Sequence, residues 1–288
     1  MSKTVAFLGP EGTYTDEACY MYAPDEHRVP FASLGLVTGA LEEGKVHEAV
    51  VPIENSLGGT VIEVVDYLIT STKARIKDEI LLPIDHCLIT RPNVQLSDIR
   101  VVMSKQEALT QCRQFLSEKL RYSEQIATTS TALAVTNLKE GDDRTAAIGP
   151  RRSAKLAGLP ILANGIQDRE NNVTRFAVLT SGGNPDKASN KTSIAFDFDS
   201  PDAPGLVYGA LMPFADRGIN LLKIESRPTG KGIGSYIFLL DFEGHIDTLN
   251  VQEAISELKN HTATFKVLGT YPRAKDLSVR SAPFNQRN

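Results

Sequence analysis

Hydrophobic positions in the first 180 residues alternate between short apolar runs and helical repeats. Residues 5–8 and 49–53 are apolar runs of strand length, and each is followed by a turn with glycine or polar residues. Residues 61–68 then carry valine and leucine at the i, i+3, i+4, i+7 spacing of one helix face. A strand at 100–103 and a helix over 108–119 repeat the pattern. Strands that alternate with helices predict largely parallel sheets joined by right-handed crossovers. We also expect a helix that begins near Thr13, and strands at 146–149 and 173–179.

A polar segment rich in turn residues, 182–191, is the best candidate for a linker. After it the apolar positions predict strand, helix, two strands, helix and strand within about eighty residues. This βαββαβ order predicts a ferredoxin-like arrangement, an antiparallel sheet with two helices on one face. Pro213 lies inside the first helix, so a kink or a late helix start is expected. The tail at 274–288 has no apolar periodicity and is expected to be mobile.

Composition narrows the range of functions. The chain has 288 residues and a net charge of −4, with no long block of either sign, which argues against a nucleic-acid or anionic-membrane surface. The first apolar run breaks at Gly9, too early for a signal or membrane segment, so a cytoplasmic protein is expected. Three widely spaced cysteines among apolar neighbours predict buried free thiols. The five histidines show no metal-ligand spacing, so no metal is expected.

Three upstream segments, residues 9–15, 52–59 and 104–112, are expected to converge on residues 171–176. Each places hydroxyl, amide or glycine backbone groups at a strand end, where an α/β sheet presents its ligands. Such groups suit the polarisation of a small polyanion by hydrogen bonds, without a cofactor. In the first segment, glycines at the strand-to-helix turn would let backbone N–H groups face an anion.

Each segment also has a structural alternative. The glycine turn could merely connect two elements, and Thr13 could cap its own helix. Ser104 could be an N-cap, with Gln111 solvated on the same helix. For Ser130, in the segment Ser130-Thr131-Ala132, an ordinary N-cap is the favoured interpretation. Thr174 lies in or just before a strand, where a β-branched residue is common for reasons of propensity alone.

Five segments resemble, in order and spacing, the signature segments of prephenate dehydratases. Two segments beyond the linker resemble the ACT regulatory domain of the same enzymes. There are departures from the pattern: Lys105 and Gln106 follow Ser104 where His and Pro are common, and Leu206 and Val207 replace the more frequent Ala and Leu. The segments are 9–15, 52–56, 104–112, 130–132 and 172–176 for the enzyme, and 204–208 and 224–228 for the ACT domain.

The resemblance implies an α/β fold of two Rossmann-like lobes, similar to a type 2 periplasmic binding protein, plus a C-terminal ferredoxin-like ACT domain. The catalytic domain would span 1–181 and the ACT domain 192–273. The first lobe would contain about 1–80 and 162–181, and the second about 81–161, so that two strands form a hinge. No chorismate mutase segment is recognised, so the monofunctional form is expected.

The resemblance also implies a function, the conversion of prephenate to phenylpyruvate with loss of carbon dioxide and water, as a lyase of phenylalanine biosynthesis that needs no cofactor. Thr174 would assist departure of the ring hydroxyl. Arg175 would either bind a carboxylate or form a structural ion pair with Glu54 or Asp168. The other catalytic candidates are Asn55, Gln111 and Ser104, and the other substrate-binding candidates are Thr13, Ser56, Ser130, Thr131 and Phe176.

The resemblance to ACT domains implies feedback regulation by L-phenylalanine. It also implies that the protein forms a homodimer or a homotetramer. Two alternatives stay open. Arogenate dehydratase shares all these motifs, and a non-catalytic amino-acid-binding sensor could use the same scaffold. The effector candidates are Gly205, Leu206, Val207, Glu225, Ser226, Arg227 and Pro228.

Overall fold

The structure is a computed structural model, and it describes residues 3–198, 203–229 and 235–274. The chain packs as two compact units. Unit 1 is formed by Met1–Val64 and Ile80–Phe176, and unit 2 by Val65–Glu79 and Ala177–Asn288. The tail that was expected to be mobile lies, from residue 275, outside the described residues.

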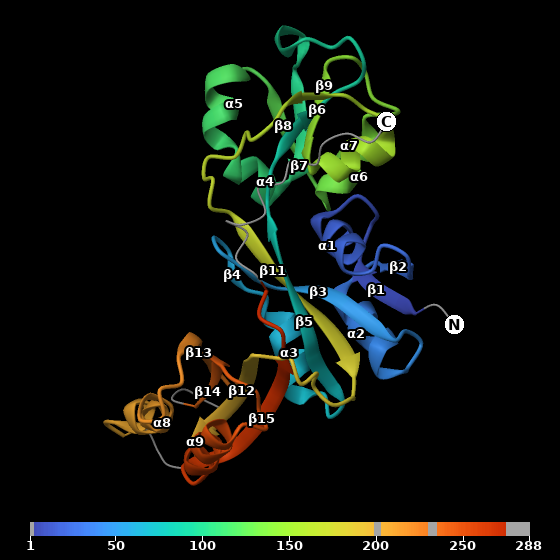
Figure 1. The fold of residues 1–288 in the computed structure, drawn as a ribbon. Helices are drawn as coiled ribbons and strands as arrows, with labels where there is room; N and C mark the ends of the chain where they lie inside the picture. Colours follow the sequence, from blue (N-terminus) through green and yellow to red (C-terminus); the bar gives the residue numbers. More distant parts are fainter. Residues whose placement is uncertain (1–2, 199–202, 230–234, 275–288) are drawn as a thin grey trace. The chain divides into compact units, whose positions relative to one another are not determined.

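Figure 1 shows the order of the elements along the chain. Most of them alternate between strand and helix up to β11, as the hydrophobic pattern predicts. The elements are β1 (Thr4–Leu8), α1 (Tyr14–Tyr22), β2 (His27–Phe31), α2 (Leu34–Glu42), β3 (Glu48–Asn55), β4 (Gly59–Thr60), α3 (Ile62–Thr70), β5 (Ala74–Pro83), β6 (Cys87–Ile89), a 3₁₀ turn (Leu96–Asp98), β7 (Val101–Lys105), α4 (Gln106–Gln111), α5 (Arg113–Lys119), β8 (Glu124–Thr128), α6 (Thr131–Asn137), β9 (Thr145–Gly149), α7 (Arg151–Ala157), β10 (Ile161–Ala163), β11 (Val173–Ser181), β12 (Lys191–Phe198), α8 (Leu206–Ala215), β13 (Leu221–Pro228), β14 (Tyr236–Glu243), α9 (Leu249–Lys259) and β15 (Thr262–Tyr271).

The first lobe of unit 1 is built on the strand order β11-β3-β1-β2. Strand β1 pairs in parallel with both β2 and β3. Ala49, Val50 and Val51 of β3 are fully buried, because helices cover both faces of a central parallel strand. The sequence analysis missed β2 and α2. Helix α2 starts after Ser33, whose side chain accepts a hydrogen bond from the Leu36 N–H.

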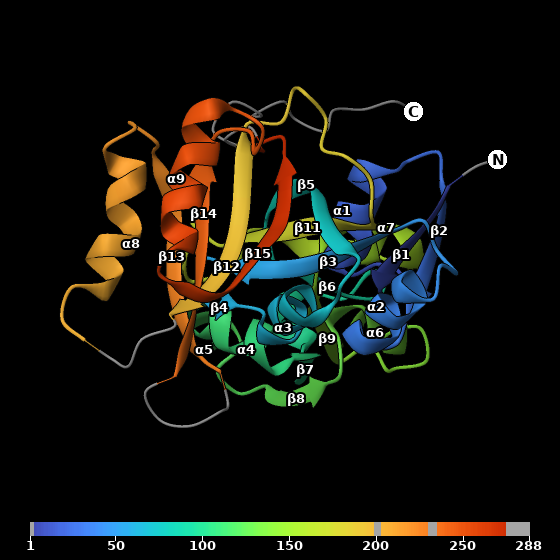
Figure 2. The same ribbon diagram turned by 90° about the horizontal axis from the view of Figure 1, so that it is seen from below.

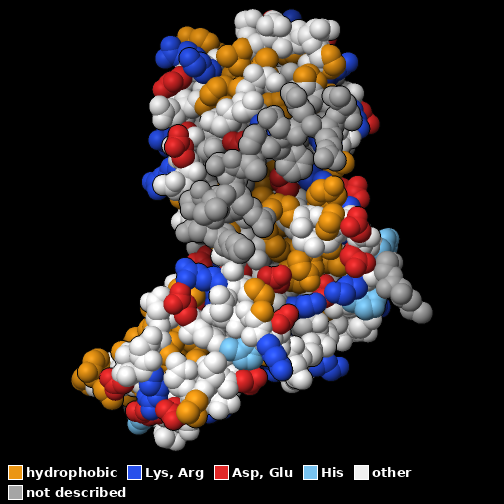
Figure 3. Space-filling view, in the orientation of Figure 1, with side chains coloured by type: hydrophobic (Ala, Val, Ile, Leu, Met, Phe, Trp, Pro, Cys, Tyr) orange, Lys and Arg blue, Asp and Glu red, His pale blue; other side chains and the backbone are white. Residues whose placement is uncertain are grey.

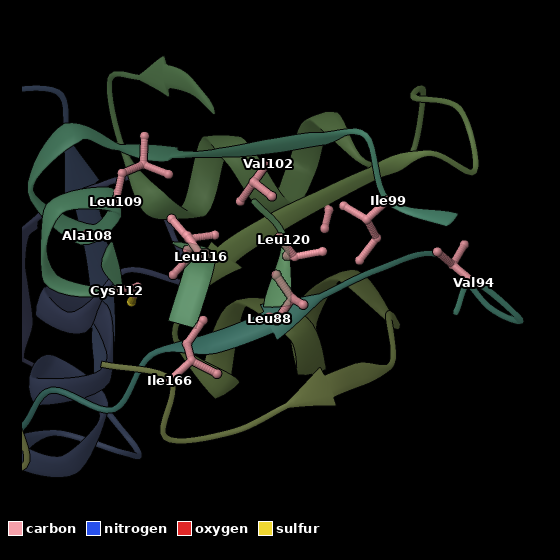
Figure 4. Packing of buried hydrophobic residues seen from close by; sticks show 12 residues of the cluster. Leu88, Val94, Ile99, Val102, Ala108, Leu109, Cys112, Leu116, Leu120 and Ile166 are labelled. Atoms are coloured by element: carbon pink, nitrogen blue, oxygen red, sulfur yellow. The ribbon is translucent and has the colours of Figure 1, made fainter. Parts of the chain in front are cut away.

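The second lobe of unit 1 has the strand order β10-β6-β9-β7-β8. Strand β7 is parallel to β8 and β9, whereas β6 and β10 add an antiparallel edge to the sheet that was expected to be largely parallel. Figure 4 shows the core of this lobe, in which Leu109 and Leu116 lie near Val102 and Leu88 of the sheet. The helix expected over 108–119 is two helices, because Cys112 leaves the helical backbone conformation between α4 and α5.

The C-terminal part of unit 2 confirms the predicted βαββαβ order. Its strands follow the order β13-β14-β12-β15, and all neighbouring pairs are antiparallel. Helices α8 and α9 cover one face of the sheet (Figure 2), and their buried side chains pack on Ile194, Phe196 and Phe242. Helix α8 begins at Leu206, so of the two alternatives expected for Pro213, a kink or a late start, the late start is wrong, and Pro213 lies in the last turn of the helix.

Unit 2 also contains the first part of β5, which lies beside β15. Gly269 of β15 pairs with Ile76 of β5, and a Cβ atom on Gly269 would lie 2.2 Å from the Ile76 carbonyl oxygen. Only glycine permits this approach of two backbones. Next to it the buried Lys191 forms an ion pair with Glu79 at 2.8 Å. Residues 74–79 are therefore packed as part of the C-terminal sheet.

Charged side chains of both signs are interspersed on the face drawn in Figure 3. In the described part of the chain, no helix is both long enough and apolar enough to cross a membrane.

Candidate active site

Thr174 and Asn55, 119 residues apart in the sequence, meet where β11 lies beside β3. The Asn55 Nδ2 atom donates to Thr174 Oγ1 at 2.9 Å and to Asn172 Oδ1 at 2.8 Å. Thr174 and Asn172 are buried, and Asn55 is partly buried. The fold therefore brings together two of the catalytic candidates that the sequence analysis named.

The orientation of the Asn55 amide is fixed by the backbone. Its Oδ1 atom accepts hydrogen bonds from the N–H groups of Leu57, at 3.0 Å, and Gly58, at 2.8 Å. A backbone N–H can only donate, so the oxygen must face these two groups and the nitrogen must face Thr174. Thr174 Oγ1 is thus an acceptor of this bond and keeps its own hydrogen. In the described structure, no protein group accepts that hydrogen.

A row of polar side chains continues from Asn172 into the second lobe. The Asn172 Nδ2 atom donates to Gln111 Oε1 at 2.9 Å, and His86 Nε2 lies 2.9 Å from the same oxygen. On its other side, His86 Nδ1 is 3.0 Å from the Tyr14 hydroxyl, and this hydroxyl is also 2.9 Å from the Asp85 carbonyl oxygen. Hydrogen-bonded side chains thus connect the Thr174–Asn55 pair to Tyr14 on α1.

Burial determines the charge state of this row. Burial lowers the pKa of His86, although the hydrogen bond to Gln111 and the charge of Asp85 raise it in part. Burial also raises the pKa of Tyr14 well above its usual value. At neutral pH both groups are uncharged, so the row acts through oriented hydrogen bonds.

A small cavity of about 140 Å³ lies next to the row. Gln111 and Asn172 line it, whereas Thr174 and Asn55 do not. The Gln111 Nε2 atom has no hydrogen-bond partner among the described residues. Small-molecule sites usually measure about 300–1,000 Å³, so this cavity accommodates only part of a substrate. Its other lining residues are Leu57, Thr110, Gln167, Asp168 and Arg169.

Three further site candidates lie beside the Thr174–Asn55 pair. The Ser56 hydroxyl donates to the Asn171 carbonyl oxygen at 2.8 Å and accepts from the Val173 N–H at 2.9 Å, so it connects the end of β3 to the start of β11. Arg175 Nη1 lies 3.3 Å from Glu54 Oε2, which is one of the two ion pairs that the sequence left open. Phe176 is almost fully buried in the core.

Three other candidates have hydroxyl groups engaged elsewhere, and a fourth, Thr131, lies in helix α6. Ser104 is fully buried and donates to the Ile148 carbonyl oxygen at 2.6 Å. Thr13 is the N-cap of α1 and accepts from the Asp16 N–H at 3.2 Å. Ser130 is the N-cap of α6, as the favoured interpretation stated, and Thr131 is buried in the first turn of that helix. The structure does not place these four hydroxyl groups in the row.

The Gly12 backbone, in the glycine turn before α1, is already hydrogen-bonded within the protein. The Gly12 N–H donates to Asp16 Oδ2 at 2.8 Å, and the Gly12 carbonyl oxygen accepts from the Ser153 hydroxyl at 2.6 Å. The buried Asp16 in turn forms an ion pair with the partly buried Arg152, at 2.5 Å between Oδ2 and Nε. The expectation of an anion site at Gly12 is wrong, because the Asp16 carboxylate already occupies that N–H group.

Sequence analysis missed His86 as a site residue, and it did not select Tyr14 or Asn172 from the motifs that contain them. Asp85 and His86 form a polar pair between the apolar Ile84 and Cys87, at the start of β6. This interruption of an apolar run was the available signal. It could not show that His86 faces Gln111 and Tyr14, which come from two other elements.

The effector candidates all belong to unit 2. Gly205 precedes α8 in the left-handed region, with a φ of +90°, where glycine is favoured, and Leu206 and Val207 form the first turn. Strand β13 carries Glu225, Ser226, Arg227 and Pro228. The Arg227 guanidinium donates two hydrogen bonds, of 2.7 and 3.2 Å, to the Asp66 carboxylate on α3.

Cys19, Cys87 and Cys112 are free and buried, as predicted. Burial raises the pKa of their thiols to about 12, 11 and 12, respectively. They therefore stay protonated at neutral pH. Among the described residues, no group of three His, Cys, Asp or Glu side chains could hold a metal ion.

Comparison with known proteins agrees with this architecture. The family model for prephenate dehydratase matches residues 5–184, and that for the ACT domain matches residues 195–260. The chain is 34% identical to a prephenate dehydratase of Mycolicibacterium gilvum, over 98% of this chain and 95% of that protein. It is 36% identical to arogenate dehydratase/prephenate dehydratase 1 of Arabidopsis thaliana, over 93% of this chain and 71% of that protein.

Among solved structures, prephenate dehydratase from Arthrobacter aurescens in complex with L-Phe is 36% identical and superimposes with a TM-score of 0.85, covering 94% of this chain and 90% of that one. The family model for the enzyme alone spans more than half of the chain, and the ACT model spans most of the C-terminal sheet and helices. The chain therefore belongs to the prephenate dehydratase family.

Proposed function

We propose that this protein catalyses the decarboxylative dehydration of prephenate to phenylpyruvate, with the Thr174–Asn55 pair assisting the departure of the ring hydroxyl. The main support is the hydrogen bond from Asn55 Nδ2 to Thr174 Oγ1 in a chain of the prephenate dehydratase family. It leaves the Thr174 hydrogen available to a substrate oxygen.

The reaction requires two bond cleavages and one proton. The bond from the ring to its carboxylate breaks, and its electron pair enters the ring while carbon dioxide leaves. The ring then expels its hydroxyl group, which takes one proton and departs as water. A threonine hydroxyl is too weak an acid to donate that proton alone. Thr174 therefore donates its proton in the transition state and takes a proton back from water.

Asn55 makes Thr174 a better donor. A hydroxyl that accepts a hydrogen bond donates its own hydrogen more strongly, because the two bonds polarise one another. The Asn55 N–H also stabilises negative charge that develops on Thr174 Oγ1. Orientation of a bound substrate can contribute roughly 7–11 kcal/mol, and one preorganised donor about 3–4 kcal/mol. These two effects suit a reaction in which the product is aromatic.

Gln111 is the second donor in this proposal. Its amide nitrogen has no hydrogen-bond partner among the described residues, and this and its position at the cavity support a hydrogen bond to a substrate oxygen. Arg175 is better supported as a structural partner of Glu54 than as a carboxylate ligand. Four candidates have hydroxyl groups that are engaged within the protein, so in this proposal they support the site through the backbone: Ser56, Ser104, Thr13 and Ser130. Thr131 lies in the first turn of α6.

The same proposal assigns domains and regulation. Residues 1–181 form the catalytic domain, 182–191 the linker and 192–273 the regulatory domain. L-phenylalanine binds near the start of α8 and β13, at Gly205, Leu206, Val207, Glu225, Ser226, Arg227 and Pro228. In this proposal the first backbone N–H groups of α8 face the carboxylate of the bound phenylalanine. The solved complex of the Arthrobacter aurescens enzyme with L-Phe supports this choice of effector.

We further infer a homodimer or homotetramer, because an ACT site between subunits would couple effector binding to the quaternary state. The cytoplasm is the compartment that fits three free thiols, since reducing compartments keep cysteines unpaired.

Arogenate is the second candidate substrate, since the Arabidopsis relative carries both names. The two substrates differ in a side-chain amino group, so a comparison of kcat/KM for prephenate and arogenate decides between them. A non-catalytic sensor is less well supported, because sensing alone does not require a threonine hydroxyl that accepts from Asn55. The test is to incubate pure protein with prephenate and to follow phenylpyruvate absorbance. No turnover of either substrate would contradict the proposal.

A further inference from the structure

His86 is buried between Tyr14 and Gln111, and the proposed reaction does not use it. Its side chain is 2% exposed, and both ring nitrogens have partners, Gln111 on one side and Tyr14 on the other. We propose that His86 is a positioning residue, which holds the Gln111 amide with its oxygen inward and its nitrogen toward the substrate cavity. The inference rests on the proposed function.

The direction of every bond in the row follows from the backbone. Leu57 and Gly58 fix Asn55 with its nitrogen toward Asn172, so Asn172 Oδ1 must be the acceptor. Asn172 Nδ2 is then the group that faces Gln111, and Gln111 Oε1 must accept from it.

Gln111 Oε1 is therefore an acceptor for both of its neighbours, Asn172 and His86. For His86 to bond to it, the Nε2 atom of the ring must carry a hydrogen. The neutral ring has only one N–H, so its Nδ1 atom is an acceptor. The single hydrogen of the Tyr14 hydroxyl is shared between Nδ1, 3.0 Å away, and the Asp85 carbonyl oxygen, 2.9 Å away. The orientation of Gln111 thus assigns the hydrogen of the neutral His86 ring to Nε2.

His86 and Asn172 hold Gln111 from two directions. With a single partner, the Gln111 amide could rotate about that one hydrogen bond. Two donors to the same oxygen fix the plane of the Gln111 amide group. The Gln111 nitrogen is then directed away from both partners and has no protein partner among the described residues, and Gln111 is one of the residues that line the cavity. A buried group that orients a ligand-binding side chain commonly contributes to activity without contacting the substrate.

Two substitutions of His86 separate positioning from packing. In His86→Gln the amide nitrogen takes approximately the place of Nε2, so a donor to Gln111 is kept. In His86→Asn the amide takes approximately the place of Nδ1, so the contact with Tyr14 is kept and the donor to Gln111 is lost. The two variants differ by one methylene group and share the same functional group, so they are matched.

We expect His86→Asn to lower kcat/KM for prephenate by about tenfold to hundredfold, the range for one lost hydrogen bond to a positioned group. His86→Gln should recover most of that loss. Equal activity of the two variants would overturn the proposal. Circular dichroism of both proteins serves as the check on folding.

A measurement that needs no turnover tests the tautomer. Nitrogen-15 NMR of the parent protein, with the His86 signals assigned from the His86→Gln spectrum, should show a protonated Nε2 and an unprotonated Nδ1 at neutral pH. A hydrogen on Nδ1 alone would overturn the proposal, even if a variant fails to fold. Failure of the proposed function would look different. The parent protein would then be inactive on prephenate although His86 has the expected tautomer.

Discussion

Replacing Asn55 by aspartate changes one atom of the site and reverses the most important hydrogen bond. The aspartate would keep one oxygen for the N–H groups of Leu57 and Gly58. Its second oxygen would take the place of Nδ2, which now lies 2.9 Å from Thr174 Oγ1 and 2.8 Å from Asn172 Oδ1. A carboxylate cannot donate, so it would draw the Thr174 hydrogen toward itself and away from the substrate.

The size of the effect follows from these two contacts. Loss of one donor aimed at developing charge costs about 10²–10³ in kcat, or roughly 3–4 kcal/mol. Two acceptors that lose their donor also reduce the free energy of unfolding, by about 1–3 kcal/mol each. We therefore expect Asn55→Asp to lower kcat by at least about a hundredfold and to shift the urea midpoint downward.

The assay is steady-state turnover of prephenate, followed by phenylpyruvate absorbance, with urea unfolding in parallel. Asn171→Asp is a matched control, because it introduces the same charge at an exposed side chain for which the described structure shows no hydrogen bond. The control should keep kcat within about threefold, well short of the loss of a catalytic donor. An Asn55→Asp variant that turns over prephenate as fast as the control would refute the assigned role of the amide.

Two further predictions address other parts of the chain. The native protein should show no thiol reaction with a disulfide reagent at pH 7, and it should show three reactive thiols in urea. The reason is that burial raises the pKa values of Cys19, Cys87 and Cys112 to about 12, 11 and 12. Rapid labelling of the folded protein would contradict the burial of these thiols. Asp66→Asn should weaken inhibition by phenylalanine while leaving uninhibited turnover in place, because Asp66 pairs with Arg227 of the effector segment. The check is an inhibition curve with calorimetric titration of phenylalanine, and unchanged inhibition would show that the Arg227–Asp66 pair takes no part in the response.

The sequence predicted those features that depend on local periodicity. The valine and leucine repeat at 61–68 predicted α3, and the apolar positions after 191 predicted the βαββαβ order. The segments of Asn55 and Thr174 were also expected to converge, because both carry polar groups next to a strand of an α/β sheet. Their contact joins the end of β3 to the start of β11, a pairing that the expected parallel order did not specify. These predictions needed only the spacing of side chains and the rules of sheet topology.

Features that depend on tertiary contacts were not predictable. Gly12 resembles an anion-binding turn in sequence, but the buried Asp16 side chain, held by Arg152, supplies the anion. Ser104 resembles a substrate donor, but its strand places the hydroxyl next to the Ile148 carbonyl oxygen. His86 resembles a core residue, and only the packing of α1 and α4 beside it brings Tyr14 and Gln111 to its two nitrogens.

The most direct test of the central claim is a comparison of Thr174→Ser with Thr174→Val on prephenate. Serine keeps the hydroxyl that accepts from Asn55, whereas valine keeps the shape and loses the hydroxyl. The account predicts that Thr174→Val loses at least about two orders of magnitude in kcat and that Thr174→Ser retains much more of the parent's turnover. Equal losses in the two variants, or a valine variant within about threefold of the parent, would show that the Thr174 hydroxyl does not assist the reaction.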